Sequence, residues 1–506
     1  MVQHAPAQHN EVIADWPQTK AACASHDNRG MTTASNASPT DFSALQLPAH
    51  VLANLTQLGY TQMTPIQAAS LPVALLGKDL IAQAKTGSGK TAAFGIALLA
   101  NLNARRFAVQ SLVLCPTREL ADQVATEIRR LARAEENVKV VVLCGGVPLR
   151  NQTASLENGA HIIVGTPGRI MDHLGRGNLK LDALNTLVLD EADRMLDMGF
   201  FEDICVVAKQ CPAERQTLLF SATYPEGIAK LSKQFMKEPQ TITVQAQHEK
   251  TKIQQRWYQV PDSDHDEARL GAVAQVLMHY RPASTLAFCN TKSLCRALVA
   301  YLKDQGFSAL ALFGELEQRE RDQVLVQFAN RSCSVLVATD VAARGLDIAQ
   351  LAMVINVDVT PDAEVHIHRI GRTGRADEEG WAISLASMDE MGYVGKIEVM
   401  QKSESVWHKL AELTPASNEP LLPPMITLQI VGGRKEKIRA GDVLGALTGD
   451  AGNVPPFTRE QVGKINVNEF STYVAIDRTL ASQAQQKLAN GGVKGKSVKV
   501  RFMDEV

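Results

Sequence analysis

The 506-residue sequence has almost no net charge, no closely spaced cysteine pair and no long apolar run. Its 52 Lys and Arg residues nearly balance 54 Asp and Glu residues, giving a formal net charge of −2, so any surface that binds a polyanion must be local. The eight cysteines include no CxxC pair, which argues against a zinc site and a disulfide framework and favours reduced, buried thiols. No apolar run reaches the roughly 18 residues of a membrane span, and the N-terminus lacks the apolar core of a secretory signal. We therefore expect a cytoplasmic protein without a membrane partner.

The distribution of apolar and polar segments predicts three domains, as the chain length also suggests at roughly 150 residues per domain. Residues 1–40 are rich in Ala, Ser, Thr, Asn, Gln and His and are expected to be disordered; Met31 is a candidate translation start. Short β-rich runs alternate with helical patterns over residues 41–244 and again over residues 254–405, which predicts two parallel sheets wrapped by helices, with a polar linker at 245–253. The strands expected in these blocks are 79–84, 111–115, 138–143, 161–164, 186–189, 216–220, 284–288, 334–338 and 353–356, and a helix is expected at 388–405.

The C-terminal part of the chain has a different pattern. Residues 406–424 end in a stretch with four prolines, which we expect to act as a tether. Residues 425–506 contain elements in the order βαββαβ, which predicts a small α+β sandwich with one open sheet face. The expected strands are 426–431, 462–467, 471–476 and 497–502, and the expected helices are 440–447 and 480–489. Twelve basic residues minus eight acidic residues give this segment a charge of +4, which indicates a modest basic patch.

A glycine-rich stretch lies between an apolar run and an alanine-rich helical pattern; it reads Ala84-Lys85-Thr86-Gly87-Ser88-Gly89-Lys90-Thr91. A strand, a glycine loop and a helix in this order surround a phosphate with backbone N–H groups and a helix N-terminus. Lys90 would neutralise the β- and γ-phosphates, and the Thr91 hydroxyl would hold Mg²⁺. A lone GxG is more often an ordinary turn, but the Gly-Lys-Thr ending favours a nucleotide site.

Four residues, Asp190-Glu191-Ala192-Asp193, follow the apolar run 187–189, so their carboxylates are expected at the C-terminal end of a strand. Open parallel sheets bind their ligands at that edge. Asp190 suits Mg²⁺ held through water, and Glu191 suits deprotonating the attacking water. A solvated acidic turn explains the tetrapeptide equally well on its own, but its place about 100 residues after a phosphate loop favours the catalytic interpretation.

From Phe42 onward, the motifs resemble those of the DEAD-box family of RNA-dependent ATPases. The run 59–67, Gly-Tyr-Thr-Gln-Met-Thr-Pro-Ile-Gln, is similar to the motif with which that family binds adenine. By this resemblance Gln67 hydrogen-bonds the adenine edge, Phe42 is the upstream aromatic residue, and Asp347 hydrogen-bonds the ribose. The resemblance also implies two RecA-like domains.

Further motifs resemble the family's contacts with the RNA backbone. Arginine forks, hydroxyls and closely approaching glycine amides bind phosphate oxygens without reading bases. In the first domain the resemblance implies contacts from Pro116, Thr117, Arg118, Gly145, Gly146, Thr166, Gly168 and Arg169, and in the second from Gln318, Arg321, Thr339 and Asp340. Each motif also fits an ordinary turn or strand end. Ser221 and Thr223 resemble the hydroxyl motif that couples the carboxylate loop to the RNA side.

The run 368–375, His-Arg-Ile-Gly-Arg-Thr-Gly-Arg, resembles the family's arginine-finger motif. Arg372 and Arg375 would reach the γ-phosphate only when the second domain closes on the first, and such arginines accelerate phosphoryl transfer by about 10³- to 10⁵-fold. An arginine cluster is usually a solvated surface, but Gly371 and Gly374 between the charges favour a tight site. His368 is expected to couple this loop to the carboxylate motif. Phe313 stands where the family often has a histidine.

The C-terminal domain resembles an RNA-recognition module with few stacking residues, since its first strand has no aromatic residue and its third keeps only Tyr473. We expect a folded RNA to be held by shape and phosphate through two basic loops, which contain Lys435, Lys437, Arg439, Lys494 and Lys496. The run 438–450 resembles the DbpA group of bacterial DEAD-box proteins, which implies a hairpin in the peptidyl-transferase region of 23S rRNA as the target. A stability or protein-binding appendage is the alternative.

Together these motifs predict an ATP-dependent RNA helicase, using ATP and Mg²⁺, that is targeted to 23S rRNA and remodels maturing large ribosomal subunits (pre-50S particles). The alternative is an ATP-gated clamp that holds RNA as an assembly platform with little strand separation. The presence of Glu191, Arg372 and Arg375 favours the helicase, because a clamp could dispense with them. We expect a monomer.

Overall fold

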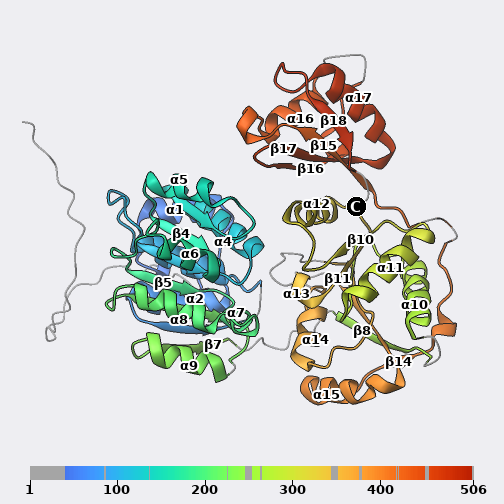
Figure 1. Cartoon of the computed structure of the whole chain (residues 1–506), viewed down its shortest axis with the longest axis horizontal. Helices are drawn as coiled ribbons and strands as arrows, with labels where there is room; N and C mark the ends of the chain where they lie inside the picture. Colours follow the sequence, from blue (N-terminus) through green and yellow to red (C-terminus); the bar gives the residue numbers. More distant parts are fainter. Residues whose placement is uncertain are drawn as a thin grey trace, which may run out of the picture.

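The computed structural model describes residues 40–84, 87–135, 137–224, 226–244, 253–261, 265–343, 351–374, 379–417, 419, 421–450 and 455–503. It contains two seven-stranded sheets and one four-stranded sheet, in three lobes (Figure 1). The extension expected to be disordered, with Met31, lies outside the described residues except for Thr40, as do Lys85, Thr86, Asp347 and Arg375. None of the described helices combines the length and apolar character needed to cross a bilayer.

Domain 1 is a parallel sheet covered by helices on both faces. Its strands are β1 (Leu80–Gln83), β2 (Ser111–Leu114), β3 (Val140–Leu143), β4 (Ile162–Gly165), β5 (Thr186–Leu189), β6 (Gln216–Ser221) and β7 (Gln240–Thr243), in the order β3-β4-β2-β5-β6-β1-β7. The inner strands are runs of Leu, Ile and Val buried on both faces, as parallel strands between two helix layers require. This order places β5, β6 and β1 side by side, so the loops that follow them meet at one edge.

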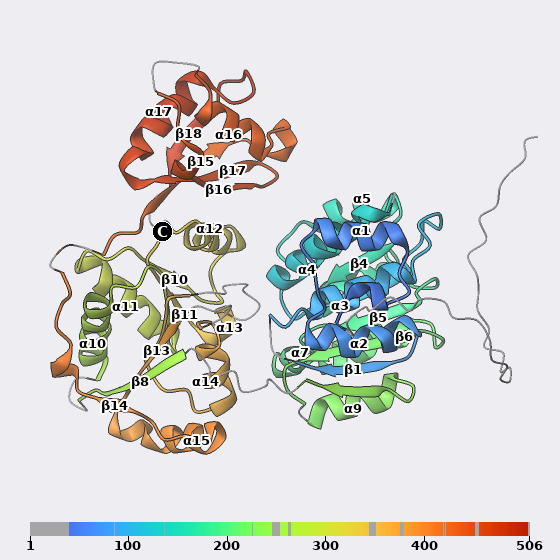
Figure 2. The ribbon, with the colours of Figure 1, turned by 180° about the vertical axis from the view of Figure 1, so that it is seen from behind.

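The helices of domain 1 divide between the two faces. One face packs against α2 (Pro65–Leu75), α3 (Lys90–Ala100) and α4 (Arg118–Leu131), with α1 (Ala49–Gln57) outside them (Figure 2). The other face packs against α6 (Pro167–Gly175), α7 (Ala192–Asp197), α8 (Phe201–Gln210) and α9 (Glu226–Phe235). α5 (Leu149–Glu157) follows β3. The expected α/β class of this domain is confirmed.

Domain 2 repeats the architecture. Its parallel strands are β8 (Ile253–Gln259), β9 (Thr285–Phe288), β10 (Ala309–Leu312), β11 (Val335–Ala338), β12 (Met353–Asn356), β13 (Gly380–Ala386) and β14 (Trp407–His408), in the order β10-β11-β9-β12-β13-β8-β14. Its helices are α10 (His265–Tyr280), α11 (Lys292–Asp304), α12 (Gln318–Ala329), α13 (Asp340–Ala343), α14 (Ala363–Ile370) and α15 (Met391–Gln401). The sequence pattern does not predict β8, because Ile-Gln-Gln-Arg-Trp-Tyr-Gln lacks an apolar run, nor β7, β10, β13 and β14. The helix expected at 388–405 is shorter.

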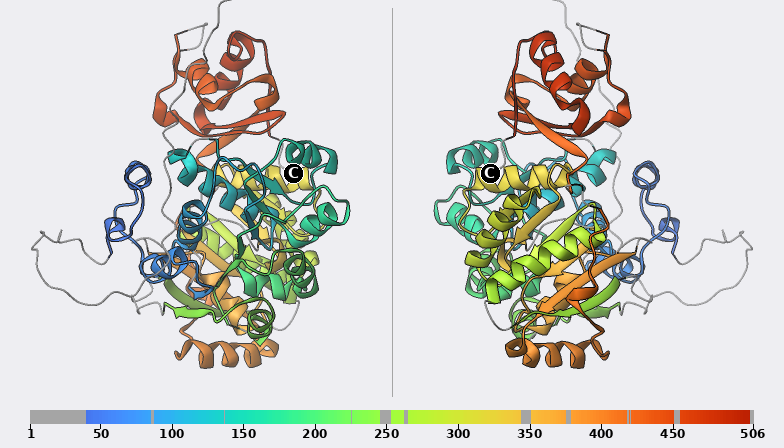
Figure 3. Two further views of the ribbon diagram at one scale, coloured as in Figure 1. Left: turned by 90° about the vertical axis from the view of Figure 1, so that its left-hand side faces the viewer. Right: turned by 90° about the vertical axis from the view of Figure 1, so that its right-hand side faces the viewer.

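The C-terminal domain has the expected βαββαβ order. β15 (Met425–Val431), β16 (Val462–Val467), β17 (Ser471–Asp477) and β18 (Lys499–Phe502) form an antiparallel sheet in the order β16-β17-β15-β18. α16 (Ala440–Thr448) and α17 (Ala481–Gly491) cover one face, where Leu428 and Ile430 join the core. The other face is turned toward domain 2, and α12 lies beneath it (Figure 3).

The proline-rich stretch between domain 2 and the C-terminal domain lies along domain 2. Leu421 is buried in the domain 2 core, and its carbonyl accepts a hydrogen bond from Ser334 Oγ at 3.4 Å. Arg478 of the C-terminal domain donates from Nε to the Pro423 carbonyl at 2.6 Å. The described part of this segment is therefore attached at both ends, unlike the free tether that its composition suggests.

Candidate nucleotide and RNA site

The phosphate loop follows β1 and leads directly into α3. Lys90, the first residue of α3, is 6% exposed, and its ammonium donates to the Ala84 carbonyl at 2.9 Å. Gly87 and Gly89 have φ angles of 81° and 93°, a conformation that favours glycine. The Ser88 hydroxyl is buried and has no hydrogen-bond partner among the described residues. A buried ammonium, an unpartnered hydroxyl and two left-handed glycines fit a phosphate group.

Gln67 connects the adenine motif to this loop. It is 1% exposed, its Oε1 accepts from the Thr64 N–H at 2.9 Å, and its Nε2 donates to the Gly89 carbonyl at 3.1 Å. A Cβ atom at Gly89 would lie 2.6 Å from Nε2, so only glycine fits there. Phe42 is buried, and its ring meets the edge of Tyr60 at 6.1 Å. The hydrogen bonds of Gln67 to adenine stay a prediction.

Asp190 and Glu191 follow β5 and face the phosphate loop. Asp190 is 3% exposed, and burial raises its pKa to about 7, although the charge of Lys90 opposes the shift. Glu191 has φ 51°, a conformation uncommon for a residue other than glycine. Its Oε2 accepts from Arg194 Nη1 at 2.6 Å, and both side chains are buried. The Asp190 carboxylate therefore carries little compensating charge, which suits a cation, while Arg194 fixes the orientation of Glu191.

Asp193 ties the carboxylate loop to the end of β6. Its Oδ2 accepts from the Ala222 N–H, the Thr223 N–H and the Thr223 hydroxyl at 3.0, 2.8 and 3.0 Å, and its own N–H donates to Ser221 Oγ at 3.3 Å. Although burial opposes the shift, these hydrogen bonds lower the pKa of Asp193. The expected coupling residues Ser221 and Thr223 thus meet the carboxylate motif. The sequence analysis did not select Asp193 as a site residue, although it is the fourth residue of that motif.

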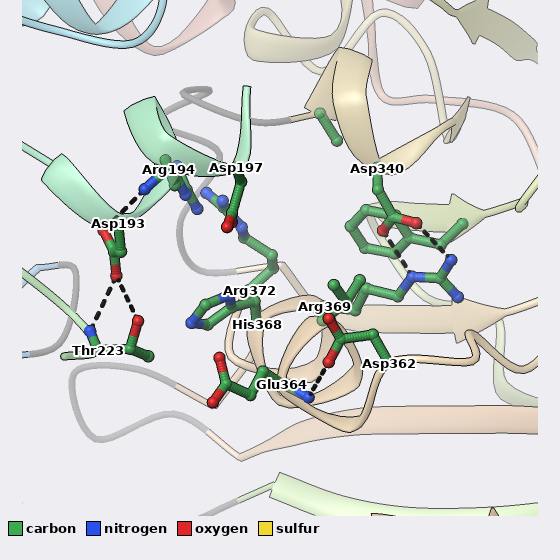
Figure 4. A pocket seen from close by; sticks show the side chains of 13 residues that line it. Asp193, Arg194, Asp197, Thr223, Asp340, Asp362, Glu364, His368, Arg369 and Arg372 are labelled. Carbon is green, nitrogen blue, oxygen red and sulfur yellow. Dashed lines mark hydrogen bonds and ion pairs between the residues drawn. The ribbon is translucent and has the colours of Figure 1, made fainter. Parts of the chain in front are cut away.

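Domain 2 brings α14 against the carboxylate loop. Asp193, Arg194 and Thr223 of domain 1 line one crevice together with His368 and Arg372 of domain 2 (Figure 4). Burial lowers the pKa of His368, and Arg194 and Arg372 add to this effect. Arg372 is 7% exposed. The residues expected to couple and complete the site are therefore at the domain boundary; Arg375 and Asp347 lie outside the described residues.

Arg369, which the sequence analysis did not single out, joins three neighbouring strand ends of domain 2. Its Nε and Nη2 donate to the two carboxylate oxygens of Asp340 at 2.7 Å each. Nη2 also donates to Asn290 Oδ1 at 2.7 Å, and Nη1 to the Asp358 carbonyl at 3.0 Å. Burial raises the pKa of Asp358 to about 6, with Arg369 opposing. Asp340, an expected RNA contact beside Thr339, is therefore engaged by Arg369. The only sequence signal was the arginine's place in the 368–375 motif.

The expected RNA contacts of both domains approach one another away from the nucleotide loop. A Cβ atom at Gly146 would lie 3.2 Å from Arg118 Nη1 and 3.3 Å from Gln318 Cγ. Arg321 Nε donates to Glu119 Oε1 at 2.6 Å across the domain boundary, and both side chains are largely buried. The arginines and glycines of the two domains thus form one cluster, consistent with a shared backbone-binding cleft.

The other expected RNA contacts of domain 1 flank this cluster. Thr117 caps α4, accepting from the Leu120 N–H at 3.3 Å, and Pro116 precedes it. Arg169 Nη1 donates to the Val147 carbonyl at 2.9 Å and so supports the loop that contains Gly145 and Gly146. Thr166 and Gly168 lie at the start of α6.

The two basic loops of the C-terminal domain lie side by side. Lys494 Nζ donates to the Lys437 carbonyl at 3.3 Å, and the Lys435, Arg439 and Lys496 side chains are exposed. Tyr473, by contrast, is only 5% exposed, and its hydroxyl accepts from Gln429 Nε2 at 3.2 Å. The lysines are available to an RNA in this arrangement, whereas the Tyr473 ring is covered.

Phe313, at the position where a histidine is common, has a packing role. Its ring is 8% exposed in the domain 2 core, and the Arg296 guanidinium lies 4.8 Å from the ring centre. The aromatic ring is therefore accommodated by an apolar contact and a cation–π contact.

Comparison with known proteins assigns all three domains. Family models match residues 64–231 (DEAD/DEAH box helicase), 268–377 (helicase conserved C-terminal domain) and 427–502 (DbpA RNA binding domain). ATP-dependent RNA helicase DbpA of Escherichia coli is 50% identical over 468 residues, covering 92% of this chain and 100% of the relative. The Bacillus subtilis protein of that name is 38% identical, covering 91% and 98%.

A solved structure agrees with these matches. S. cerevisiae Dbp5 bound to RNA and ADP BeF3 is 28% identical, with a TM-score of 0.65 over 74% of this chain and 96% of that one. The nucleotide loop, the carboxylate motif and the third domain thus lead to one conclusion: this chain belongs to the DEAD-box family of ATP-dependent RNA helicases and is of the DbpA type.

Proposed function

We propose that this RNA-dependent ATPase is directed by its C-terminal domain to a hairpin in the peptidyl-transferase region of 23S rRNA, where it remodels maturing large ribosomal subunits. The observation that carries the proposal is the pair of adjacent basic loops, in a domain that matches the DbpA RNA binding domain. Lysines on neighbouring loops bind phosphates of a folded RNA through charge and shape. The covered Tyr473 ring does not compete with this mode.

The nucleotide site supports ATP hydrolysis assisted by Mg²⁺. Lys90 and the glycine loop bind the phosphates, while Thr91 and Asp190 are the residues that would hold Mg²⁺. The metal, when bound, neutralises charge on the phosphate oxygens. Glu191, held by Arg194, accepts the proton of the attacking water. Arg372 and Arg375 supply positive charge from domain 2 when the domains are closed.

Closure links hydrolysis to RNA remodelling. Domain 1 and domain 2 both contribute to the nucleotide crevice and both contribute to the RNA cleft. Two ligands that each stabilise the closed arrangement strengthen one another's binding reciprocally. ATP binding therefore favours a tightly held, distorted RNA strand, and phosphate release loosens it.

The test measures ATPase stimulation of the full chain by a 23S rRNA hairpin transcript, compared with a transcript of scrambled sequence. We expect half-maximal stimulation at a hairpin concentration at least tenfold lower. Charge reversal at Lys435 and Lys437 should remove this preference, whereas Lys409→Glu, an exposed lysine outside the C-terminal domain, should retain it. Equal stimulation by both transcripts would contradict the proposed target.

A second measurement separates the helicase from an ATP-gated clamp. Single-turnover separation of a short duplex next to the hairpin is measured beside steady-state phosphate release. We expect strand separation that depends on ATP. Stable RNA retention with ATP and no strand separation would favour the clamp instead.

A further inference from the structure

Helix α12 spans the distance between the RNA cleft and the C-terminal domain. Its first turn contains Gln318 and Arg321, which reach domain 1 at Gly146 and Glu119. At 1.5 Å per residue, its 12 residues extend about 18 Å. Asn330 and Ser332 follow its last turn and contact the C-terminal domain. One rigid element therefore has the cleft at one end and the third domain at the other.

The contact at the far end of α12 is a buried polar cluster. Asn330 Nδ2 donates to Thr427 Oγ1 at 3.2 Å, and the Ser332 and Thr427 hydroxyls are 2.7 Å apart. The three residues are 2%, 9% and 2% exposed for Asn330, Ser332 and Thr427, respectively. Buried hydrogen bonds of this kind fix an orientation, because breaking one leaves its partners unsatisfied.

The chain leaves little freedom for another arrangement at this junction. The Met425 N–H donates to the Arg331 carbonyl at 3.3 Å, only two residues before Thr427. The Arg478 N–H donates to the Pro424 carbonyl at 3.0 Å. The sheet edge nearest domain 2 is therefore held by backbone bonds as well as by side chains.

The face of the sheet that contains Thr427 is engaged within the protein along its length. Gln429 lies two residues further on β15; it donates to Tyr473 and accepts from Arg501 Nε at 2.7 Å. Gln429 is 6% exposed and Tyr473 5%. RNA-recognition modules stack bases on this face, whereas here its polar groups are already paired.

We propose that this sheet face is a docking surface for domain 2, and that Thr427 positions α12, and through it Gln318 and Arg321, when the C-terminal domain holds its RNA. The inference rests on the proposed function, since the hairpin held by the basic loops is the RNA that the docked domain presents to the cleft. Thr427 touches no RNA in this role; it acts through Asn330 and Ser332.

The test compares two variants of the full chain. Thr427→Val keeps the shape and removes the hydroxyl, whereas Thr427→Ser keeps the hydroxyl and serves as the matched control. We expect Thr427→Val to bind the hairpin transcript within twofold of the parent chain, but to lose about tenfold in hairpin-stimulated kcat, a loss typical of one buried hydrogen bond. Thr427→Ser should behave as the parent chain does.

Two further readouts distinguish positioning from a loss of folding or of the target. Stimulation by single-stranded RNA without the hairpin should be unchanged in Thr427→Val, and fluorescence energy transfer between labels on domain 2 and the C-terminal domain should show a broader distance distribution. Ser332→Ala removes the same contact from the other side and should reproduce both effects. Unchanged kcat and unchanged energy transfer in both variants would overturn the inference. If the parent chain does not prefer the hairpin, the proposed target fails, while the energy-transfer measurement still tests the docking.

Discussion

Domains 1 and 2 have the same seven-stranded parallel sheet but opposite charge at the centre of their buried networks. In domain 1 the centre is the Asp193 carboxylate, which accepts hydrogen bonds from Ala222 and Thr223. In domain 2 it is the Arg369 guanidinium, which donates to Asp340 and Asn290. The comparison teaches that one architecture can serve two complementary tasks. Domain 1 presents the lysine and carboxylates that suit a metal-bound nucleotide, and domain 2 presents the cations that complete the site.

The largest expected effect concerns the carboxylate that only domain 1 has. Glu191→Gln keeps the shape and the contact with Arg194 but cannot accept a proton, so we expect RNA-stimulated hydrolysis to fall by about 10³-fold with ATP binding retained. Single-turnover phosphate release and binding of a labelled ATP analogue measure the two quantities. Glu202→Gln, at an exposed position in α8, is the control. Near-normal turnover in Glu191→Gln would show that the proton acceptor lies elsewhere.

The next effect breaks the cationic centre of domain 2. Arg369→Lys cannot form the forked pair with Asp340 or reach all its other acceptors, and we expect it to destabilise domain 2 by about 3 kcal/mol. Thermal unfolding followed by a probe in each domain measures this, and the transition of domain 1 should stay in place. Arg319→Lys, exposed on α12, is the matched variant. An equal shift of both domains would mean that their networks are not independent.

A smaller effect concerns acid sensitivity. His366 is 1% exposed and stacks on Trp257 at 5.4 Å, and burial lowers its pKa from 6.5 to about 4. Between these values the unfolded chain binds the proton and the folded chain does not, so stability is present above pH 6.5 and falls as the pH decreases toward 4. We expect a loss of about 2 kcal/mol between pH 7 and pH 5. His366→Phe keeps the stack and should remove that part of the slope in denaturant titrations; an unchanged slope would assign it to other groups.

The smallest effect compares the two networks directly. Asp193→Asn replaces an acceptor by an amide and weakens the link to Thr223, so we expect about a tenfold loss of RNA stimulation with basal ATPase nearly unchanged. Asp340→Asn should act in the same direction through Arg369. The ratio of RNA-stimulated to basal ATPase is the measurement. If Asp193→Asn lowered both rates equally, its carboxylate would serve the chemistry and not the coupling.

Much of the fold and of the nucleotide site could be predicted from sequence because the signals are local. The glycine loop, the carboxylate motif and the βαββαβ order each depend on residues close together in the chain, and each lies in the expected type of element. β8 and β14 could not be predicted in this way. β8 is rich in polar residues and β14 has only two residues, so only pairing with their neighbours in the sheet defines them.

The sequence by itself determined which chemistry is available to this protein, since lysine, carboxylates, arginines and glycines occur at spacings that only a nucleotide site explains well. The tertiary structure alone decided which of these groups meet. Arg369 becomes a centre because β11, β9 and β12 are neighbours, and Tyr473 is covered because its sheet face is turned toward domain 2. The physical reason is that pairing and burial depend on contacts between residues far apart in sequence, and no local pattern records them.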